Sequence, residues 1–311
     1  MGETMELRNG LVRVPASLPQ LPRHAEAGER VYQLAISLLE RVLRFQGIRV
    51  TARGVENVPQ FGPALLAMNH TGYYDFIFGE IPAYLRGRRL ARFMAKKEVF
   101  EVPVLGRAMR AMRHVPVDRA AGAAAIDEAV DHLRSGRLVT IFPEATISRS
   151  FELKDFKNGA ARIAYTADAP LIPMVTWGSQ RIWAKGGKKN LGRTGTPVLI
   201  YVGQPLELSG DAAADTAALK AAMEELLAQA RAEYEAEYGP FPPGQPWQPA
   251  ALGGTAPTLE EANRMDEADR ARKAREREEK AARKRAKTER KLDAKLAKKV
   301  RKAWRRLRKE R

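Results

Sequence analysis

The sequence predicts an α/β protein in which a central sheet is flanked by helices, followed by a charged tail. Two observations support this prediction. Between residues 48 and 202, short apolar runs alternate with segments of helical periodicity and are separated by Gly and Pro. Such alternation is typical of a sheet with helices packed on its faces. After residue 257 the composition changes to charged residues and Ala, which indicates a separate segment.

The first 46 residues are expected to form an arm and then a helix. Residues 1–28 contain three prolines and show no sustained hydrophobic period, which predicts a loose arm. In residues 29–46 apolar side chains recur every three to four positions, among them Val31, Leu34 and Leu38, which predicts an amphipathic helix. We interpret its apolar face as packing on the core, with membrane contact as the alternative.

The next elements are expected to build one domain that spans residues 29–238. The expected strands are residues 48–53, 64–68, 92–95, 114–117, 138–142, 171–175 and 198–202. The expected helices are residues 73–85, 104–112, 120–133, 159–167 and 213–238. Residues 239–257 are rich in Pro and Gly and are predicted to be a linker to a tail at residues 258–311.

Charge and composition limit the possible functions. The net charge is +17, of which residues 258–311 contribute +12 and the first 257 residues only +5. The basicity therefore belongs to the tail and suggests an anionic partner. The chain contains no cysteine, which excludes disulfides, thiolate metal sites and a thiol nucleophile, and agrees with a reducing cytoplasm. No run approaches the roughly 18–20 apolar residues that span a bilayer, so membrane association is expected to be peripheral.

One histidine and one aspartate are placed for acid–base chemistry. His70 follows an apolar strand and Asp75 comes five residues later. On a single helix the two would point about 140° apart, so they can meet only if His70 lies in a loop and Asp75 begins the helix. The carboxylate would then fix the tautomer of the imidazole, whose other nitrogen could take a proton from a substrate hydroxyl. A structural histidine is the alternative.

Two further expected strands end in residues that suit a polar ligand. Asp118 and Arg119 follow residues 114–117, and Glu144 follows residues 138–142, ahead of a polar loop that contains Arg149. Ligands of α/β sheets collect at the ends of strands. We therefore expect these side chains to lie near His70.

At these residues the chain resembles the glycerolipid acyltransferase family, which includes the 1-acylglycerol-3-phosphate acyltransferases. That family carries an Asn-His-x4-Asp block, a block ending in Asp-Arg, a Phe-Pro-Glu-Gly-Thr-Arg-Ser block and an apolar strand with a proline. Here the blocks are NHTGYYD (69–75), VPVDR (115–119), FPEATIS (142–148) and LIPMV (171–175). The resemblance covers roughly residues 30–238, and it is supported by Asn69, Gly106, Pro143 and Pro173.

The resemblance implies a mixed sheet and a set of roles. His70 would be the general base on the acceptor hydroxyl, and Asp75 would orient it. Arg119, Glu144 and Thr146 would bind the glycerol-phosphate head group. The reaction implied is transfer of a fatty acyl group from acyl-CoA or an acyl carrier protein to a lysophospholipid. The acceptor expected is 1-acylglycerol-3-phosphate, which would give phosphatidic acid.

The third block departs from the family pattern. It has Ala145 and Ile147 where the family usually has Gly and Arg. Because Ile147 cannot bind phosphate, we expect Arg149 in the same loop to supply the missing charge, with Lys154 and Lys157 as alternatives. A different acceptor, such as a glycolipid, is a second possibility.

Two basic segments lie outside the four blocks. The loop at residues 184–195 contains Lys185, Lys188, Lys189 and Arg193, and is either a solvated loop or a basic lip for anionic lipid head groups. Residues 280–311 hold 17 Lys/Arg and three acids. Leu292, Leu296, Val300, Trp304 and Leu307 form a narrow apolar stripe there, which is typical of a helix that lies on an anionic membrane. A disordered tail, a coiled coil and nucleic-acid binding are the alternatives.

The sequence therefore favours a cytoplasmic O-acyltransferase that is peripheral on the inner face of the cell membrane. Its partners would be the lysophospholipid, the acyl donor and the anionic membrane surface, with no specific nucleic acid. The histidine spacing resembles no zinc site, so we predict no metal, and no cofactor apart from the donor co-substrate. A non-catalytic lipid-binding protein is one alternative. A hydrolase is another, although a Gly-x-Ser-x-Gly elbow is absent.

Overall fold

The computed structural model describes residues 4–118 and 122–307 of the chain. It contains two compact units, residues 1–258 and residues 259–311. In the first unit the described residues form a nine-stranded sheet in the order β1-β2-β3-β9-β8-β4-β7-β5-β6. The strands are β1 (Met5–Arg8), β2 (Val12–Pro15), β3 (Arg49–Arg53), β4 (Ala64–Met68), β5 (Ala91–Lys96), β6 (Val115–Val117), β7 (Leu138–Ile141), β8 (Leu171–Trp177) and β9 (Pro197–Val202).

The sheet is mixed, as expected. The β1–β2 and β8–β9 pairs are antiparallel, and the other neighbouring strands run parallel. Strand β4 lies in its middle, between β7 and β8, and all its side chains are buried. Its residues alternate between the two apolar cores, with Leu65 and Ala67 in one and Leu66 and Met68 in the other. The next residues, Asn69 and His70, therefore leave the sheet at its centre.

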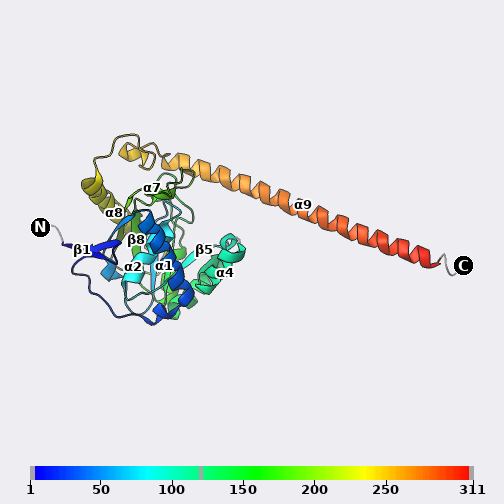
Figure 1. The fold of residues 1–311 in the computed structure, drawn as a ribbon, viewed down its shortest axis with the longest axis horizontal. Helices are drawn as coiled ribbons and strands as arrows, with labels where there is room; N and C mark the ends of the chain where they lie inside the picture. Colours follow the sequence, from blue (N-terminus) through cyan, green and yellow to red (C-terminus); the bar gives the residue numbers. More distant parts are fainter. Residues whose placement is uncertain (1–3, 119–121, 308–311) are drawn as a thin grey trace. The chain divides into compact units, whose positions relative to one another are not determined.

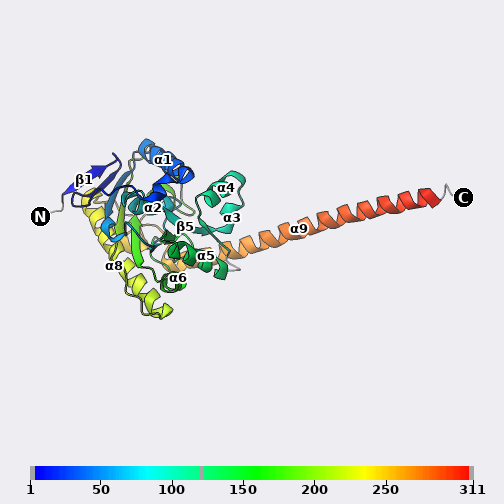
Figure 2. The ribbon, with the colours of Figure 1, turned by 90° about the horizontal axis from the view of Figure 1, so that it is seen from below.

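Helices cover both faces of the sheet. Helices α5 (Gly122–Arg134), α6 (Gly159–Ala167) and α8 (Ala212–Tyr238) pack on one core, and α1 (Arg30–Phe45) and α2 (Asp75–Leu85) pack on the other. Figure 1 shows the strands with helices around them, and Figure 2 shows α1 and α2 on one side of the strands and α5, α6 and α8 on the other. The short helices are α3 (Lys97–Phe100), α4 (Pro103–Ala111) and α7 (Gln180–Trp183). The α/β class with a central sheet flanked by helices is confirmed.

The loose arm predicted for residues 1–28 is wrong. Strands β1 and β2 form a hairpin, and β2 pairs in parallel with β3 at the edge of the sheet. The turn between them contains Asn9 and Gly10, both with positive φ. Asn-Gly between apolar alternations is a strong hairpin signal, because both residues tolerate that conformation. The prediction of a loose arm relied on the three prolines and on the missing hydrophobic period, and did not use this signal.

The apolar face of α1 packs only partly on the core. Tyr32 and Leu43 are buried, whereas Val31, Leu34, Leu38 and Phe45 are exposed. Our interpretation that this face packs on the core is therefore correct for only part of it. Several large apolar side chains of this helix remain on the surface of the protein.

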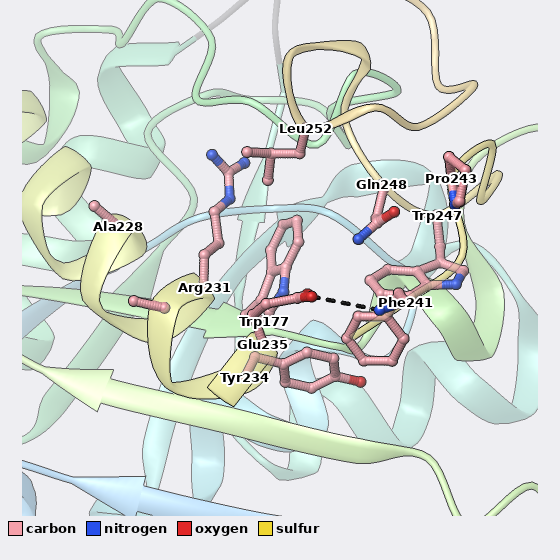
Figure 3. A pocket seen from close by; sticks show the side chains of 11 residues that line it. Trp177, Ala228, Arg231, Tyr234, Glu235, Phe241, Pro243, Trp247, Gln248 and Leu252 are labelled. Atoms are coloured by element: carbon pink, nitrogen blue, oxygen red, sulfur yellow. Dashed lines mark hydrogen bonds between the residues drawn. The ribbon is translucent and has the colours of Figure 1, made fainter. Parts of the chain in front are cut away.

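The segment expected to be a linker folds back onto α8 instead. Beyond a short 3₁₀ turn at Ala250–Leu252 it has no regular element, but Phe241 and Trp247 pack against the core. Between this segment and α8 lies a cavity of about 560 Å³. Figure 3 shows its lining, which is mostly apolar: Trp177, Ala228, Arg231, Ala232, Tyr234, Glu235, Phe241, Pro243, Trp247, Gln248 and Leu252.

The second unit is one long helix, α9 (Leu259–Leu307). Its first turn is acidic, and ion pairs one turn apart follow, such as Arg264 with Glu260 and Arg272 with Glu276. Of the predicted apolar stripe, the side chains of Leu296 and Val300 are described, and both are exposed. The tail was expected to be either helical or disordered, and in the structure residues 259–307 form a helix. In the described chain no helix is both long and apolar enough to cross a bilayer.

Candidate active site

His70 and Asp75 meet in the way that their spacing predicted. His70 lies in the loop after β4, and Asp75 is the first residue of α2. The Nδ1 atom of His70 is 2.9 Å from Oδ2 of Asp75. The imidazole also stacks on the ring of Phe142, with the ring centroids 4.1 Å apart. The loop, the carboxylate and the aromatic ring together fix the orientation of the imidazole.

The carboxylate of Asp75 is fully buried and has many hydrogen-bond donors. Oδ2 also accepts from the backbone N–H groups of Thr71 (2.6 Å) and Gly72 (2.8 Å), and Oδ1 accepts from the hydroxyl of Ser179. Each of these groups is a donor, and the carboxylate oxygens accept from them. Nδ1 of His70 is therefore the donor in its hydrogen bond to Asp75, and Nε2 is the ring nitrogen that faces away from this bond.

The end of β4 is held to β8 by a side chain. Asn69 is fully buried, and its Oδ1 accepts from the N–H of Thr176 at 2.7 Å while its Nδ2 donates to the carbonyl of Thr176 at 3.1 Å. The amide thus continues the β4–β8 ladder past its last backbone pair, Met68 with Met174. This anchor explains why an asparagine directly precedes His70, whose side chain remains 21% exposed.

The carboxylate of Glu144 binds backbone N–H groups around His70. It is buried, and its Oε1 accepts from the N–H of His70 at 2.7 Å while Oε2 accepts from the N–H of Lys154 at 3.1 Å. Burial raises the pKa of Glu144 to about 8. The N–H of Ser148 donates to the carbonyl of His70 at 2.7 Å. The third block therefore binds both the N–H and the carbonyl of His70. Because both carboxylate oxygens of Glu144 accept from backbone N–H groups, its position does not favour the predicted contact with the head group.

The remaining predicted residues differ in where they lie. Arg119 falls outside the described residues, and Asp118 before it forms an ion pair with Lys97. Gly106 is needed for packing, because a Cβ there would lie 1.9 Å from the carbonyl oxygen of Phe100. Pro143 and Pro173 are buried, and their carbonyls accept from the N–H groups of Lys157 and Gly203, respectively.

Thr146 and Arg149 lie in the third-block loop, which Ser148 joins to the carbonyl of His70. The hydroxyl of Thr146 accepts from Nζ of Lys185 at 3.3 Å. Arg149 lies against Gly186, where an added Cβ would be 2.5 Å from Nη1. Ile147 between them is buried, with 7% of its surface exposed. The third block thus meets the basic loop predicted at residues 184–195.

The sequence interpretation missed Ser179, which binds both Asp75 and the hydroxyl of Thr71 (3.1 Å). Its signal was weak, since a Gly-Ser pair after a strand is common in turns. Lys185 was noticed as part of a basic loop, but nothing in the sequence placed it beside Thr146. Both contacts join residues that are far apart along the chain.

Comparison with known proteins identifies the family. The model of the family described as Acyltransferase matches residues 49–177, which include all four blocks. A 1-acyl-sn-glycerol-3-phosphate acyltransferase of Bacillus subtilis is 31% identical over 183 residues, which is 57% of this chain and 82% of that protein. A chloroplastic enzyme of the same name from Arabidopsis thaliana is 28% identical over 157 residues, which is 49% of this chain but only 43% of that protein.

A solved structure supports the fold. The 1-acyl-sn-glycerophosphate acyltransferase PlsC from Thermotoga maritima aligns with a TM-score of 0.50 and 22% identity, covering 68% of this chain and 88% of that one. The family match spans β3 to the end of β8, the part of the sheet that carries His70, Asp75 and Glu144. With the blocks in order and the Bacillus relative matched over most of its length, this chain belongs to the acyltransferase family.

Proposed function

We propose that this chain is an O-acyltransferase that moves a fatty acyl group from acyl-CoA or an acyl carrier protein to the free hydroxyl of a lysophospholipid. The acceptor that the names of the relatives favour is 1-acylglycerol-3-phosphate, with phosphatidic acid as the product. The observation that carries the proposal is the hydrogen bond between His70 and Asp75, whose buried carboxylate also accepts from two backbone N–H groups. That pair leaves a basic Nε2 on a partly exposed ring.

In the proposed reaction His70 acts directly on the acceptor. Its Nε2 takes the hydroxyl proton as the oxygen attacks the thioester carbonyl, and the carbon–sulfur bond breaks when the tetrahedral intermediate collapses. The proton passes from the imidazolium to the departing thiolate, so the enzyme returns to its starting state. Asp75 stabilises the imidazolium in between. Glu144 is a positioning residue, because it holds the backbone N–H of His70.

The site would work at a membrane surface, where its lipid substrates reside. Two features support peripheral attachment: the exposed apolar residues Val31, Leu34, Leu38 and Phe45 on α1, and the basic helix α9. Apolar side chains can enter the boundary between head groups and acyl chains, and basic residues add attraction to anionic lipid. We assign the inner face of the cell membrane on the same grounds.

The test is a panel of acceptors and donors. Purified protein is incubated with acyl-CoA or acyl carrier protein and with lysophosphatidic acid, lysophosphatidylcholine, monoacylglycerol or a glycolipid, and the products are identified by mass. The proposal expects phosphatidic acid as the main product. Release of free fatty acid without acylated acceptor would favour a hydrolase, and no turnover with any pair would favour a lipid-binding protein.

A further inference from the structure

The third block lacks a cation at the position where the family usually has one. Ile147 is buried at that position, so its side chain offers nothing to a phosphate. The loop around it is nonetheless held close to His70, because the neighbouring Ser148 donates its N–H to the carbonyl of His70. A phosphate bound there would need a charge from residues outside the block, 142–148.

Lys185 brings a charge to that loop. Its ammonium donates to the hydroxyl of Thr146, the residue directly before Ile147, with 3.3 Å between Nζ and Oγ1. Lys185 is half-buried, and it belongs to a segment more than thirty residues further along the chain. The charge missing within the block is thus present beside it, on a second loop.

The chain just before this second loop is fixed at two points to the segment that carries His70 and Asp75. Before α7, Ser179 donates its hydroxyl to Asp75. At the end of α7, the carbonyl of Trp183 accepts from the N–H of Tyr73 at 2.9 Å, and the rings of these two residues are 4.6 Å apart. Lys185 comes two residues later, so its backbone is held in register with the loop that carries His70.

Arg149 completes the arrangement from the opposite side. Lys185 reaches from its own loop to Thr146, while Arg149 reaches from the third-block loop to Gly186. A side chain at position 186 would collide with the guanidinium, and Gly186 has a φ of 80°, which favours glycine. Two cations and a hydroxyl therefore lie along the contact between the two loops. This combination suits a phosphate better than a neutral group.

We propose that Lys185, together with Arg149, binds the phosphomonoester of the acceptor and takes the place of the arginine that the third block lacks. This inference rests on the proposed acyl transfer and deepens it. A phosphomonoester is close to dianionic at neutral pH, because its second pKa is about 6. Two cations match that charge, whereas a phosphodiester carries one negative charge and monoacylglycerol carries none.

The decisive variant is Lys185→Met, which keeps an unbranched apolar side chain and removes the charge. Kinetics with lysophosphatidic acid should show a KM increased roughly 10- to 100-fold, the usual worth of one hydrogen bond to a charged group, with kcat nearly unchanged. The KM for monoacylglycerol should not change. Lys185→Arg should retain most of the affinity, and Lys188→Met, in the same loop and exposed, should behave as the wild type.

A second variant tests the replacement itself. Ile147→Arg in the Lys185→Met background restores the cation of the family pattern and should recover part of the lost affinity, provided that a thermal melt shows a folded protein. An equal change in KM for charged and neutral acceptors in Lys185→Met would overturn the proposal. A KM for lysophosphatidic acid within twofold of the wild type would do the same.

Direct binding separates this site from the reaction. Short-chain lysophosphatidic acid, below its micellar concentration, is titrated calorimetrically into wild-type protein and into Lys185→Met. If the wild type binds and the variant binds at least tenfold more weakly, the site stands even where no turnover is found, and only the acyl transfer fails. Equal binding by the two proteins contradicts the role of Lys185 whatever the activity.

Discussion

At the scale of single residues, Ala145 shows how a departure from a motif affects the backbone. Its φ is 56°, in the left-handed region where a Cβ costs about 1–2 kcal/mol and where the family usually has glycine. Part of that cost is offset by the lower entropy that Ala leaves in the unfolded chain. The position therefore stores strain beside Glu144, which holds His70.

Ala145→Gly should raise the free energy of unfolding by about 0.5–1 kcal/mol, because strain relief exceeds the added chain entropy. Urea denaturation measures this change. The matched control is Ala221→Gly, an exposed site inside α8, which should lower stability by about 1 kcal/mol. A loss of stability at both positions would show that Ala145 is not strained.

Glu80 makes stability depend on pH. Burial raises its pKa to about 8, and Oε2 accepts from the hydroxyl of Tyr32 and the N–H of Ala91, whereas Oε1 is buried without a partner among the described residues. The folded state holds this proton more tightly than the unfolded chain. Its stabilising contribution is therefore full below pH about 4.5 and is lost as pH rises to about 8.

Glu80→Gln should flatten the fall in stability between pH 5 and pH 8, by up to about 1.4 kcal/mol per pH unit. Denaturant titrations at several pH values measure the slope, and exposed Glu56→Gln serves as the control. If the variant and the wild type show the same slope, Glu80 is ionised throughout this range and the assignment is wrong.

Sequence reasoning reached His70 and Asp75 because their contact is local. A loop residue and the first residue of the following helix are bound to be neighbours, so spacing was sufficient. The contacts of Ser179 with Thr71, of Lys185 with Thr146 and of Glu144 with His70 join segments 39 to 108 positions apart. No local pattern encodes such contacts, which depend on the order of strands in the sheet.

At the scale of elements, apolar periodicity placed the strands β3 to β9 to within two residues at each end. Helices α1, α2, α4, α5, α6 and α8 were placed similarly. Elements buried on one or both faces carry strong patterns, which explains this agreement. The two α-helices of four residues, α3 and α7, are too short to show a period, and their positions follow from packing.

The segment after α8 is the clearest failure at this scale, and Trp247 shows why. Its ring centroid is 4.8 Å from that of Phe241, and the guanidinium of Arg181 lies 4.6 Å above it. Pro and Gly correctly excluded a helix or a strand, but they do not exclude packing. Two large aromatic residues in a Pro-rich stretch were the signal for a docked segment.

Trp247→Ala should lower the free energy of unfolding by about 2 kcal/mol, since the ring is only half-buried and a fully buried one would cost more. Thermal and urea denaturation measure the effect. Leu252→Ala, at the exposed rim of the same cavity, should cost much less. A Trp247→Ala protein as stable as the wild type would mean that the segment is a linker after all.

At the scale of the whole molecule, the chain joins the unit that contains the sheet to a basic helix. Deleting residues 258–311 removes a net charge of +12. We expect weaker binding to anionic liposomes at physiological salt, because each basic residue near such a surface adds about 1 kcal/mol. Flotation with anionic and neutral vesicles measures this, and binding to neutral vesicles should change little. If the deletion impairs only RNA binding, the membrane role of α9 is wrong.

The central claim is that His70, oriented by Asp75, removes the proton from the acceptor hydroxyl. The most direct test compares the transfer rates of wild type, His70→Ala and Asp75→Asn at saturating donor and acceptor. We predict that His70→Ala loses at least 100-fold in kcat with an acceptor KM close to that of the wild type, and that Asp75→Asn lies between them. A His70→Ala protein that transfers acyl groups at the wild-type rate would contradict the account.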